Sequence, residues 1–565
     1  MGVVGLKRSS IQRGRGSVPR ILLLFAGAIA ALVASAATAA PAGAFGELTY
    51  RECIADSAAV GCQALSPAVL TGARGIAISP DGTSVYVVSV GSDSISHFVR
   101  NFDGTLTFAD CSSSNTIAGC DDIPNTPGPM LGPTDVIVSP DGKSVYVSSF
   151  QSNSLSYFTR ASDGSLDFQK CWNDSGVMGC TNLSGTPLTG ALGMALTPDG
   201  SSLYVTAQTS DDVAHFQVNA SGEPVYANCV GDDASDGCTD LATDILDGAN
   251  SAAVTTDGSS LIVTTGSIVT VDHFKIGAGG DLTFSDCAHP SGFAPCIDLP
   301  NNAVDSLSSV VASPTGMIYT AGSFNNPSLA EFALDGNDRL SFAGCFTNFG
   351  GDCTKLPTDA FENTFGAVVS PAGDSVYVTS PGNNGISSVD TLSFFRADAG
   401  GRLTFDSCQG NTGARGCFDV PGGPLDGVID AVVSPEGDSL YAVSVTSNTV
   451  SHFSRSAPPP AVGDTTPPET TIDSGPKRKV KRRAARITFS SSEAGSSFAC
   501  TIDGGTPEPC NSPITFRVKK KPRRHRFTVS ATDAAGNTDA TPASISWKVK
   551  RKHHKRHGHH GHGHH

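Results

Sequence analysis

Cysteine pairs recur along this chain at a nearly constant period, and this repeat constrains the fold more than any other feature of the sequence. In seven successive pairs the two cysteines lie nine residues apart, or eight in one case, and the pairs begin 58 to 63 residues apart. A fixed period of this size is typical of tandem units that bury their apolar faces against one another. We therefore expect one repeat architecture over most of the 565 residues.

Each pair is expected to form a local disulfide, because the same spacing in seven units favours closure within a unit over pairing between units. Sixteen cysteines also indicate an oxidising compartment. An eighth pair flanks a Gly-Gly turn further along the chain and is expected to clip a hairpin. The expected bridges are Cys53–Cys62, Cys111–Cys120, Cys171–Cys180, Cys229–Cys238, Cys287–Cys296, Cys345–Cys353, Cys408–Cys417 and Cys500–Cys510.

Each unit contains four short runs of β-branched and aromatic residues, separated by tight-turn sequences. In the first unit a run at Ile76–Ile78 precedes the turn Ser79–Gly82, and later runs contain Tyr86, Phe98 and Phe108. Val, Tyr, Phe and Thr favour strands, and Asp-Gly favours two-residue hairpins. We call the four strands A to D, from the axis outward. Four-stranded units in tandem predict an all-β, seven-bladed β-propeller.

The seventh unit ends after its C strand, at Phe453, and its missing D strand is found at the start of the chain. Residues 48–53 (Leu-Thr-Tyr-Arg-Glu-Cys) match residues 106–111 (Leu-Thr-Phe-Ala-Asp-Cys). We expect the N-terminal strand to complete the last blade, which would remove an exposed sheet edge. Because the strands alternate in direction, all seven Cys-loops are expected on one face of the propeller.

The N-terminus has the pattern of a secretory signal peptide. Five basic residues and no acidic one occur in the first twenty, followed by an apolar run from Ile21 to Val33. This run is short for a membrane span, and small residues suited to cleavage follow it, between Ala39 and Ala44. The alternative is an uncleaved membrane anchor. The mature protein is expected to be exported from a bacterial cell, secreted or associated with the cell wall.

The composition and the strand pattern of the sequence change after the last repeat. We expect a signal peptide over residues 1–44, the propeller over 45–456, a Pro-rich linker over 457–469, a small β-sandwich over 470–549 and a basic, His-rich tail over 550–565.

Charge is segregated between these parts. Residues 46–457 contain 13 Lys and Arg against 45 Asp and Glu, whereas residues 458–565 contain 20 against 8. A basic C-terminal part indicates attachment to an anionic cell-wall polymer or a membrane surface, although a simple solvated tail has the same composition. Nucleic acid is not expected as a partner, because no base-reading motif is present.

Histidines are concentrated at the C-terminus, where they form a weak candidate site for Zn, Ni or Cu, because imidazole is a good ligand for all three metals. The residues lack the fixed spacing of a built site, and no other cofactor is expected. They are His553, His554, His557, His559, His560, His562, His564 and His565.

Departures from the repeat identify the candidate ligand site, whereas residues repeated around the ring are interpreted as parts of the fold. His97, His215, His273 and His452 occupy one repeated position in strand C and are therefore assigned a structural role. Another repeated position, in strand A, holds Gly or Ser in five blades. It holds Asp135 and Asp430 in the other two, and Arg74 lies beside it in the first blade. These three residues are the candidates for a cation or polar-ligand site at the Cys-loop mouth of the channel, and no catalytic residue is assigned.

Two parts of the sequence resemble known families. The Ser-Pro-Asp-Gly-x-x-Val-Tyr-Val strings at Ser79–Val87 and Ser139–Val147 resemble the seven-bladed lactonase-type and YVTN-type propellers. That family includes 6-phosphogluconolactonase-like and muconate-lactonising enzymes as well as many surface proteins. Its catalytic residues have no matching positions here. The segments Cys500–Gly505 and Ala531–Asn537 resemble bacterial Ig-like modules.

From these patterns we expect an exported propeller that binds a ligand or protein on its Cys-loop face. Its Ig-like module and basic tail would attach it to the cell envelope. On this hypothesis the protein is a scaffold rather than an enzyme, because no convincing metal, nucleophile or phosphate-binding motif is present. The alternative hypothesis is a lactonase-like hydrolase with its site at the channel mouth.

Overall fold

Strands dominate the secondary structure in the part of the chain that the structure describes. The computed structural model contains forty-three strands and no helix among the residues that it describes. These residues are 46–58, 61–124, 128–233, 237–241, 244–300, 303–322, 326–382, 390–411, 416–456, 467–480, 484–493, 496–517, 524–532 and 537–549. The expected signal peptide, most of the expected linker and the His-rich tail lie outside the described residues. In this part of the chain no helix is long and apolar enough to cross a membrane.

Residues 46–456 form seven sheets of one design, and each contains five strands rather than the four that the sequence predicts. The A strands are β3 (Ala73–Ile78), β8 (Pro133–Val138), β13 (Ala191–Leu196), β18 (Ala249–Val254), β23 (Leu307–Ala312), β28 (Ala367–Val369) and β33 (Val428–Val433). The B strands are β4 (Ser84–Ser89), β9 (Ser144–Ser149), β14 (Ser202–Ala207), β19 (Ser260–Thr265), β24 (Met317–Gly322), β29 (Ser375–Ser380) and β34 (Ser439–Ser444). The C strands are β5 (Ser94–Arg100), β10 (Ser154–Arg160), β15 (Asp212–Val218), β20 (Val271–Ile276), β25 (Ser328–Leu334), β30 (Thr391–Ala397) and β35 (Thr449–Arg455).

The outer strands complete each sheet. The D strands are β6 (Leu106–Ser113), β11 (Leu166–Asn173), β16 (Pro224–Gly231), β21 (Leu282–His289), β26 (Leu340–Thr347), β31 (Leu403–Gly410) and β1 (Leu48–Ala55). The fifth, or E, strands are β7 (Asp121–Asp122), β12 (Thr181–Asn182), β17 (Thr239–Asp240), β22 (Ile297–Asp298), β27 (Thr354–Lys355), β32 (Phe418–Asp419) and β2 (Gln63–Ala64). Each E strand has only two residues, which is too short to show the alternating pattern by which a strand is predicted.

The E strand is produced by the Cys-loop. In the first blade Cys111 in β6 bonds to Cys120, and the chain then runs parallel to β6 as β7. All eight expected disulfides are present, with Cα–Cα distances of 4.4 to 5.8 Å. These distances lie within the usual range for a disulfide. Closing a loop of about ten residues stabilises the fold by about 2–3 kcal/mol in the chain-entropy account.

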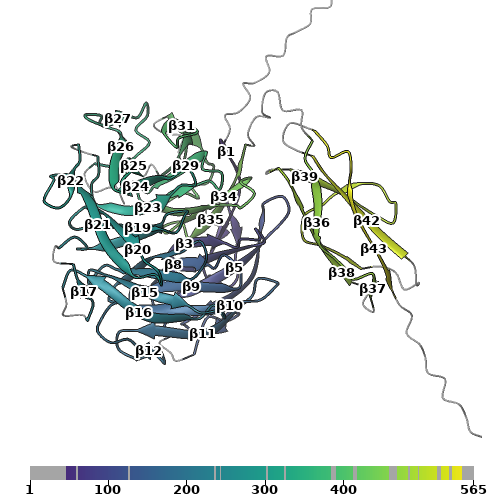
Figure 1. Cartoon of the computed structure of the whole chain (residues 1–565), viewed down its shortest axis with the longest axis horizontal. Coiled ribbons are helices and arrows are strands. Elements are labelled where there is room, and N and C mark those ends of the chain that lie inside the picture. The colour runs from purple at the N-terminus through teal and green to yellow at the C-terminus, as the bar shows by residue number, and fades with distance from the viewer. Residues whose placement is uncertain are drawn as a thin grey trace, which may run out of the picture. The chain divides into compact units, whose positions relative to one another are not determined.

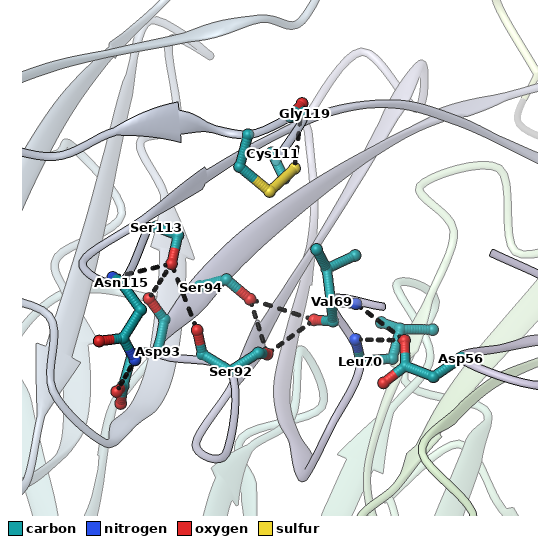
Figure 2. The surroundings of a disulfide bond; sticks show 11 residues. Asp56, Val69, Leu70, Ser92, Asp93, Ser94, Cys111, Ser113, Asn115 and Gly119 are labelled. Atoms are coloured by element: carbon teal, nitrogen blue, oxygen red, sulfur yellow. Dashed lines mark hydrogen bonds between the residues drawn. A yellow bond between two sulfur atoms is a disulfide. The ribbon is translucent and has the colours of Figure 1, made fainter. Parts of the chain in front are cut away.

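Hydrogen bonds fix the D-to-A connection between β1 and β3, which Figure 2 shows beside the first-blade disulfide. Asp56 accepts hydrogen bonds from the backbone amides of Val69 and Leu70 through one carboxylate oxygen. The carbonyl of Val69 in turn accepts from the hydroxyls of Ser92 and Ser94 in the next B–C segment. This long connection is therefore pinned both to its own blade and to the next one.

Strand β1 pairs antiparallel with β35, so residues from the two ends of 46–456 share one sheet (Figure 1). This is the pairing that the match between residues 48–53 and 106–111 predicts. The A strands contact one another in circular order, since β3 contacts both β8 and β33. Each gap between neighbouring sheets holds its own apolar cluster, and the cluster between the seventh and first sheets includes Ile54, Val85 and Tyr441.

Every B strand is buried along its whole length, because neighbouring sheets cover both of its faces. A B-strand tyrosine in six blades donates a hydrogen bond of 2.5–2.8 Å to the carbonyl of the glycine two residues before strand D of the next blade. The pairs are Tyr86–Gly164, Tyr146–Gly222, Tyr204–Gly280, Tyr319–Gly401, Tyr377–Gly46 and Tyr441–Gly104. Where Ile262 replaces the tyrosine, the facing turn has Asp338 instead of glycine.

The C-terminal region contains two sheets. One sheet contains β36 (Thr470–Ser474), β38 (Ala484–Ser491) and β41 (Ile514–Arg517). The other contains β37 (Lys479–Val480), β43 (Ala543–Val549), β42 (Arg524–Thr532), β39 (Ser497–Ile502) and β40 (Glu508–Pro509). One apolar cluster joins the sheets, with Phe489 from the first and Phe527 and Trp547 from the second. The disulfide Cys500–Cys510 clips the β39–β40 hairpin as expected.

Candidate functional site

A β-bulge near the start of the A strands shapes the mouth of the channel. The register with strand B shifts at this point in six of the seven sheets, for example between Ala73 and Gly75. A bulge can re-aim a side chain, so two consecutive residues can face the same side of a strand. We call the first of them the bulge position. Its residues all line one cavity, and they are Arg74, Thr134, Leu192, Asn250, Ser308, Phe365 and Ile429.

The cavity has a volume of about 430 Å³ and lies at the end of the channel where the A strands begin. Arg74, Asp135 and Asp430 all line it, so the structure brings together the three residues that the sequence singles out. A cavity of this size is within the range of small-molecule sites, and its lining mixes polar groups with apolar side chains. Gln208 and Asn250, which hydrogen-bond to each other, add neutral donors and acceptors to the wall.

The residue after the bulge position bridges neighbouring sheets. In Asp135 one carboxylate oxygen accepts the amide of Val136 at 2.7 Å, and the other accepts the amide of Met194 in the next sheet at 2.8 Å. The carboxylate of Asp430 accepts in the same way from Ala431 and from Ile76. Each carboxylate oxygen has a further lone pair, so these bonds leave acceptor capacity for a ligand.

Both aspartates follow a blade with glycine at the same position, namely Gly75 and Gly366. Glycine is required there because the sheets approach closely, and a Cβ on Gly366 would lie 2.5 Å from the carbonyl oxygen of Ile429. With no side chain on the preceding blade to accept their amides, Val136 and Ala431 bond to the aspartate on their own strand. The two carboxylates are thus part of the fold as well as part of the cavity.

Burial disfavours the charged form of both carboxylates. It raises the pKa of Asp135 to about 6, and backbone hydrogen bonds and Arg74 oppose this shift. The pKa of Asp430 is raised to about 7 by burial and by the charge of Asp135. Groups with such values exchange protons near neutral pH, which suits general acid–base catalysis.

Arg74 supplies the positive charge of the cavity, and no other cation among the described residues lines it. Burial lowers the pKa of the Arg74 guanidinium, and the charges of Asp430 and Asp135 counteract part of this effect. An arginine nevertheless stays protonated at neutral pH. Its Cζ atom lies 5.8 Å from the centre of the Phe365 ring, where the cation and the ring face attract each other.

The four strand-C histidines are buried away from this cavity, as their structural assignment predicts. His97, His215 and His452 stack on the B-strand tyrosines of their own blades. His273 lies between Ser260 and Asp286, at 3.0 and 3.3 Å. This arrangement has the residue types of a catalytic triad, but His273 and Ser260 are completely buried, so no substrate can reach them.

Within the described part of the chain, no group of three His, Cys, Asp or Glu side chains is placed to hold a metal ion. The histidines of the predicted C-terminal metal site lie outside that part.

Sequence reasoning missed most of the cavity wall. It found Arg74 only as a neighbour of the Gly/Asp position and did not find Asn250, Phe365 or Gln208. The bulge does not alter the alternation of apolar and polar residues in the sequence. A regular β strand would therefore place the bulge-position side chain on the other face of the sheet, away from the cavity. A signal was nevertheless present, because the residue before the Gly/Asp/Ser position is a different amino acid in each of the seven blades.

In the comparison with known proteins, one family model matches the first part of the repeat region. Residues 48–225 match the family model described as "Lactonase, 7-bladed beta-propeller". No curated protein matches the chain.

Three solved structures are similar to the chain at low sequence identity. A functionally unknown protein from Desulfotomaculum acetoxidans is 15% identical, with 66% of this chain and 93% of that chain covered and a TM-score of 0.45. A putative 6-phosphogluconolactonase from Bacteroides uniformis is 17% identical (61% and 86% covered, TM-score 0.43). The periplasmic gluconolactonase of Pseudomonas aeruginosa is also 17% identical (66% and 88% covered, TM-score 0.42).

Proposed function

We propose that the protein hydrolyses a small lactone in the channel-mouth cavity. The observation that carries this proposal is the placement of Arg74, Asp135 and Asp430 in one cavity of about 430 Å³. Near-neutral pKa values of the two carboxylates support it, as does the match of residues 48–225 to a lactonase propeller family.

Each group has a role in ester hydrolysis. The ionised carboxylate of Asp430, with a pKa of about 7, takes a proton from a water molecule. The water oxygen attacks the lactone carbonyl carbon, and the Arg74 guanidinium stabilises the negative charge that develops on the carbonyl oxygen. The ring C–O bond then breaks, and the alkoxide leaving group takes the proton back. The product is a hydroxy acid whose carboxylate is attracted to Arg74.

The test is a panel of sugar-acid and aliphatic lactones assayed with wild type and three cavity variants. Asp430→Asn and Arg74→Gln should each lower kcat/KM by about 100-fold or more, which is typical for loss of a general base or an oxyanion donor. Asp135→Asn should have a smaller effect, because it removes the charge that helps to raise the pKa of Asp430.

A matched control separates chemistry from folding. Thr379 also bridges two sheets at this end of the channel, since its hydroxyl donates to the carbonyl of Ile429. Thr379→Val removes that bond, together with the one that the hydroxyl accepts from the Gly366 amide, without changing the charge, and should keep the activity. No turnover of any lactone by wild type, or equal losses in Thr379→Val and Asp430→Asn, would contradict the proposal.

The second candidate function is a non-catalytic scaffold at the cell envelope. One observation favours it, because every carboxylate oxygen of Asp135 and Asp430 already accepts a backbone amide, so the fold alone accounts for both residues. On this proposal the protein is exported, and the two C-terminal sheets are an Ig-like sandwich. That sandwich and the basic tail attach the chain to anionic polymer or lipid.

Salt extraction tests the attachment. The chain should stay with envelope fractions at low ionic strength and be released by high salt, because exposed charges are screened. Release without salt would exclude electrostatic attachment. Weak binding of Zn²⁺, Ni²⁺ or Cu²⁺ by the C-terminal histidines belongs to the same proposal. Titration calorimetry with each ion should detect it, and deletion of residues 550–565 should abolish it.

A further inference from the structure

A second cavity of about 260 Å³ adjoins the first at the channel mouth. The two cavities share Arg74, Thr134, Leu192 and Gln208 in their walls. The two cavities therefore lie side by side, and Arg74 belongs to the walls of both.

The second cavity differs in chemistry from the first. Val90, Phe150 and Leu192 line it, and all three are half-buried apolar side chains with surface left to cover. No carboxylate among the described residues lines it, in contrast to the first cavity with Asp135 and Asp430. The rest of its lining includes the neutral polar residues Thr134, Gln151 and Gln208, so the cavity has one apolar side, against which an aliphatic or aromatic group fits.

Comparison between blades shows that this apolar wall is local to one side of the mouth. Val90 and Phe150 are the first residues after strand B in blades one and two. The residues described at this place in the other blades are Gln208, Gly266, Pro381 and Val445. Phe150 is the one aromatic residue among them, so it departs from the repeat as Arg74, Asp135 and Asp430 do.

The backbone holds Phe150 in place before any ligand arrives. The Phe150 amide donates to the carbonyl of Gly132 at 3.0 Å, and the amide of Gln151 donates to Leu131 at 3.2 Å. The backbone carbonyl of Leu192, on the opposite wall, accepts from the hydroxyls of Thr134 and Ser148. A fixed apolar wall binds a ligand without the entropic cost of ordering it.

From this geometry we infer that the channel mouth takes an amphiphilic ligand. Its carboxylate or lactone head lies in the Arg74–Asp135–Asp430 cavity, and an aliphatic or aromatic substituent lies against Val90, Phe150 and Leu192. The inference rests on the proposed function where it names the substrate class, an alkyl- or aryl-substituted lactone, but the apolar subsite itself does not depend on turnover.

The first arm of the test measures hydrolysis of γ-lactones whose alkyl substituent lengthens from methyl to hexyl. In wild type kcat/KM should rise about fourfold for each methylene that becomes buried, and the rise should stop when the subsite is full. In Phe150→Ser kcat/KM should no longer rise with the length of the alkyl substituent, whereas Phe150→Leu should keep most of that rise. Val445→Ala is the matched control, because Val445 occupies the same turn position in blade seven and lines neither cavity.

The second arm needs no turnover and measures binding of n-alkyl carboxylates, from acetate to octanoate, by titration calorimetry. The Kd of wild type should fall with chain length, Phe150→Ser should remove that dependence, and Arg74→Gln should weaken all members by a similar factor. Thermal unfolding of each variant confirms that it is folded.

The two arms separate the possible failures. Chain-length-dependent binding without any lactone turnover would exclude the hydrolase and support the subsite. Turnover of lactones with a flat chain-length series in both arms would support the hydrolase and overturn the subsite. A slope that is as steep in Phe150→Ser as in wild type would also overturn it.

Discussion

Two positions of the same repeat behave in opposite ways. In strand B six of seven blades have a tyrosine that bonds to a glycine carbonyl of the next blade, with nearly the same distance each time. At the bulge position of strand A the seven blades have seven different residues, and all of them line the channel-mouth cavity. The backbone repeats at both places, but the side-chain chemistry repeats only at the first.

This difference distinguishes the residues that the fold requires from the residues that line the cavity and can vary. The tyrosine side chains are buried, so losing a tyrosine hydroxyl leaves the glycine carbonyl of the next blade without its hydrogen-bond donor. The one junction without tyrosine confirms the coupling, because Ile262 faces a turn with Asp338 in place of glycine. The bulge-position side chains instead line the cavity, whose wall accepts residue types as different as arginine, phenylalanine and isoleucine.

The largest expected effect comes from breaking the circular order of the blades. Deleting residues 46–53 removes most of β1 and exposes the edge of β35. The loss should exceed about 5 kcal/mol, which is the lower end of the stability of a whole domain, and the protein should aggregate. Solubility and thermal unfolding measure it.

The deletion also removes Cys53, so a control is needed for the disulfide. Replacing both Cys53 and Cys62 with serine should cost only about 2–3 kcal/mol. A deletion variant as stable as this double variant would show that β1 contributes little beyond its disulfide.

A smaller effect should follow from adding one methyl group at a blade junction. A Cβ on Gly280 would lie 2.2 Å from Ser202 Oγ and 2.3 Å from His215 Nε2, and its φ of +89° is strained for other residues. Gly280→Ala should therefore cost about 3 kcal/mol in denaturant unfolding.

The junction without tyrosine supplies the matched control. Asp338 occupies the equivalent turn position with a φ of +60° and pairs with Lys275 on the surface. Asp338→Ala should cost at most about 1 kcal/mol. Equal losses of unfolding free energy in Gly280→Ala and Asp338→Ala would show that junctions with and without the tyrosine do not differ in this way.

Removing one tyrosine hydroxyl should lower the free energy of unfolding by less than adding the methyl group does. Tyr204→Phe leaves the carbonyl of Gly280 without its hydrogen-bond donor in a buried gap. The expected loss is about 1–2 kcal/mol, measured by urea unfolding with an unchanged m-value. A neutral result would mean that the repeated hydrogen bond is not what holds neighbouring blades together.

The last expected effect concerns the channel and depends on pH. The folded pKa of Asp430 is raised to about 7 from the ordinary 3.8, so the folded state binds its proton more tightly than the unfolded state. The stability from this group is fully present below about pH 4 and is lost as the pH rises through about 7. The Tm should therefore fall less between pH 5 and pH 8 in Asp430→Asn than in wild type.

A surface residue controls for the change in net charge. Asp419 is an exposed aspartate at the end of β32, and Asp419→Asn should keep the pH dependence of wild type. The same pH dependence in all three proteins would show that Asp430 titrates as an ordinary surface carboxyl.

Much of the fold could be predicted from the sequence, because a pattern found in one blade can be compared with the same pattern in the other blades. The period of the Cys pairs indicated the blades and their disulfides, and residues 48–53 predicted the strand that completes the seventh sheet. The two-residue E strands could not be predicted, since a parallel pairing of two residues depends on the shape of the closed Cys-loop. The coupled loss of Tyr and Gly at Ile262 and Asp338 was visible in the sequence but is understood only from the hydrogen bond.

The candidate site was predictable only in part. Asp135 and Asp430 stood out as charged residues at a position that is otherwise Gly or Ser. The remaining lining depends on the bulge, which places two successive residues toward the channel, and on B–C turns such as that of Phe150. Neither feature follows from alternation along a strand.

In the proposed function Asp430 acts as a base beside Arg74 at the channel mouth. The pH dependence of kcat/KM tests this role, measured for hydrolysis of glucono-δ-lactone and of an alkyl-substituted γ-lactone and corrected for the spontaneous reaction. The rate of at least one substrate should rise through about pH 7, following the pKa of Asp430, and fall by about 100-fold in Asp430→Asn. No rate above the spontaneous reaction, or the same pH profile in Asp430→Asn, would contradict it.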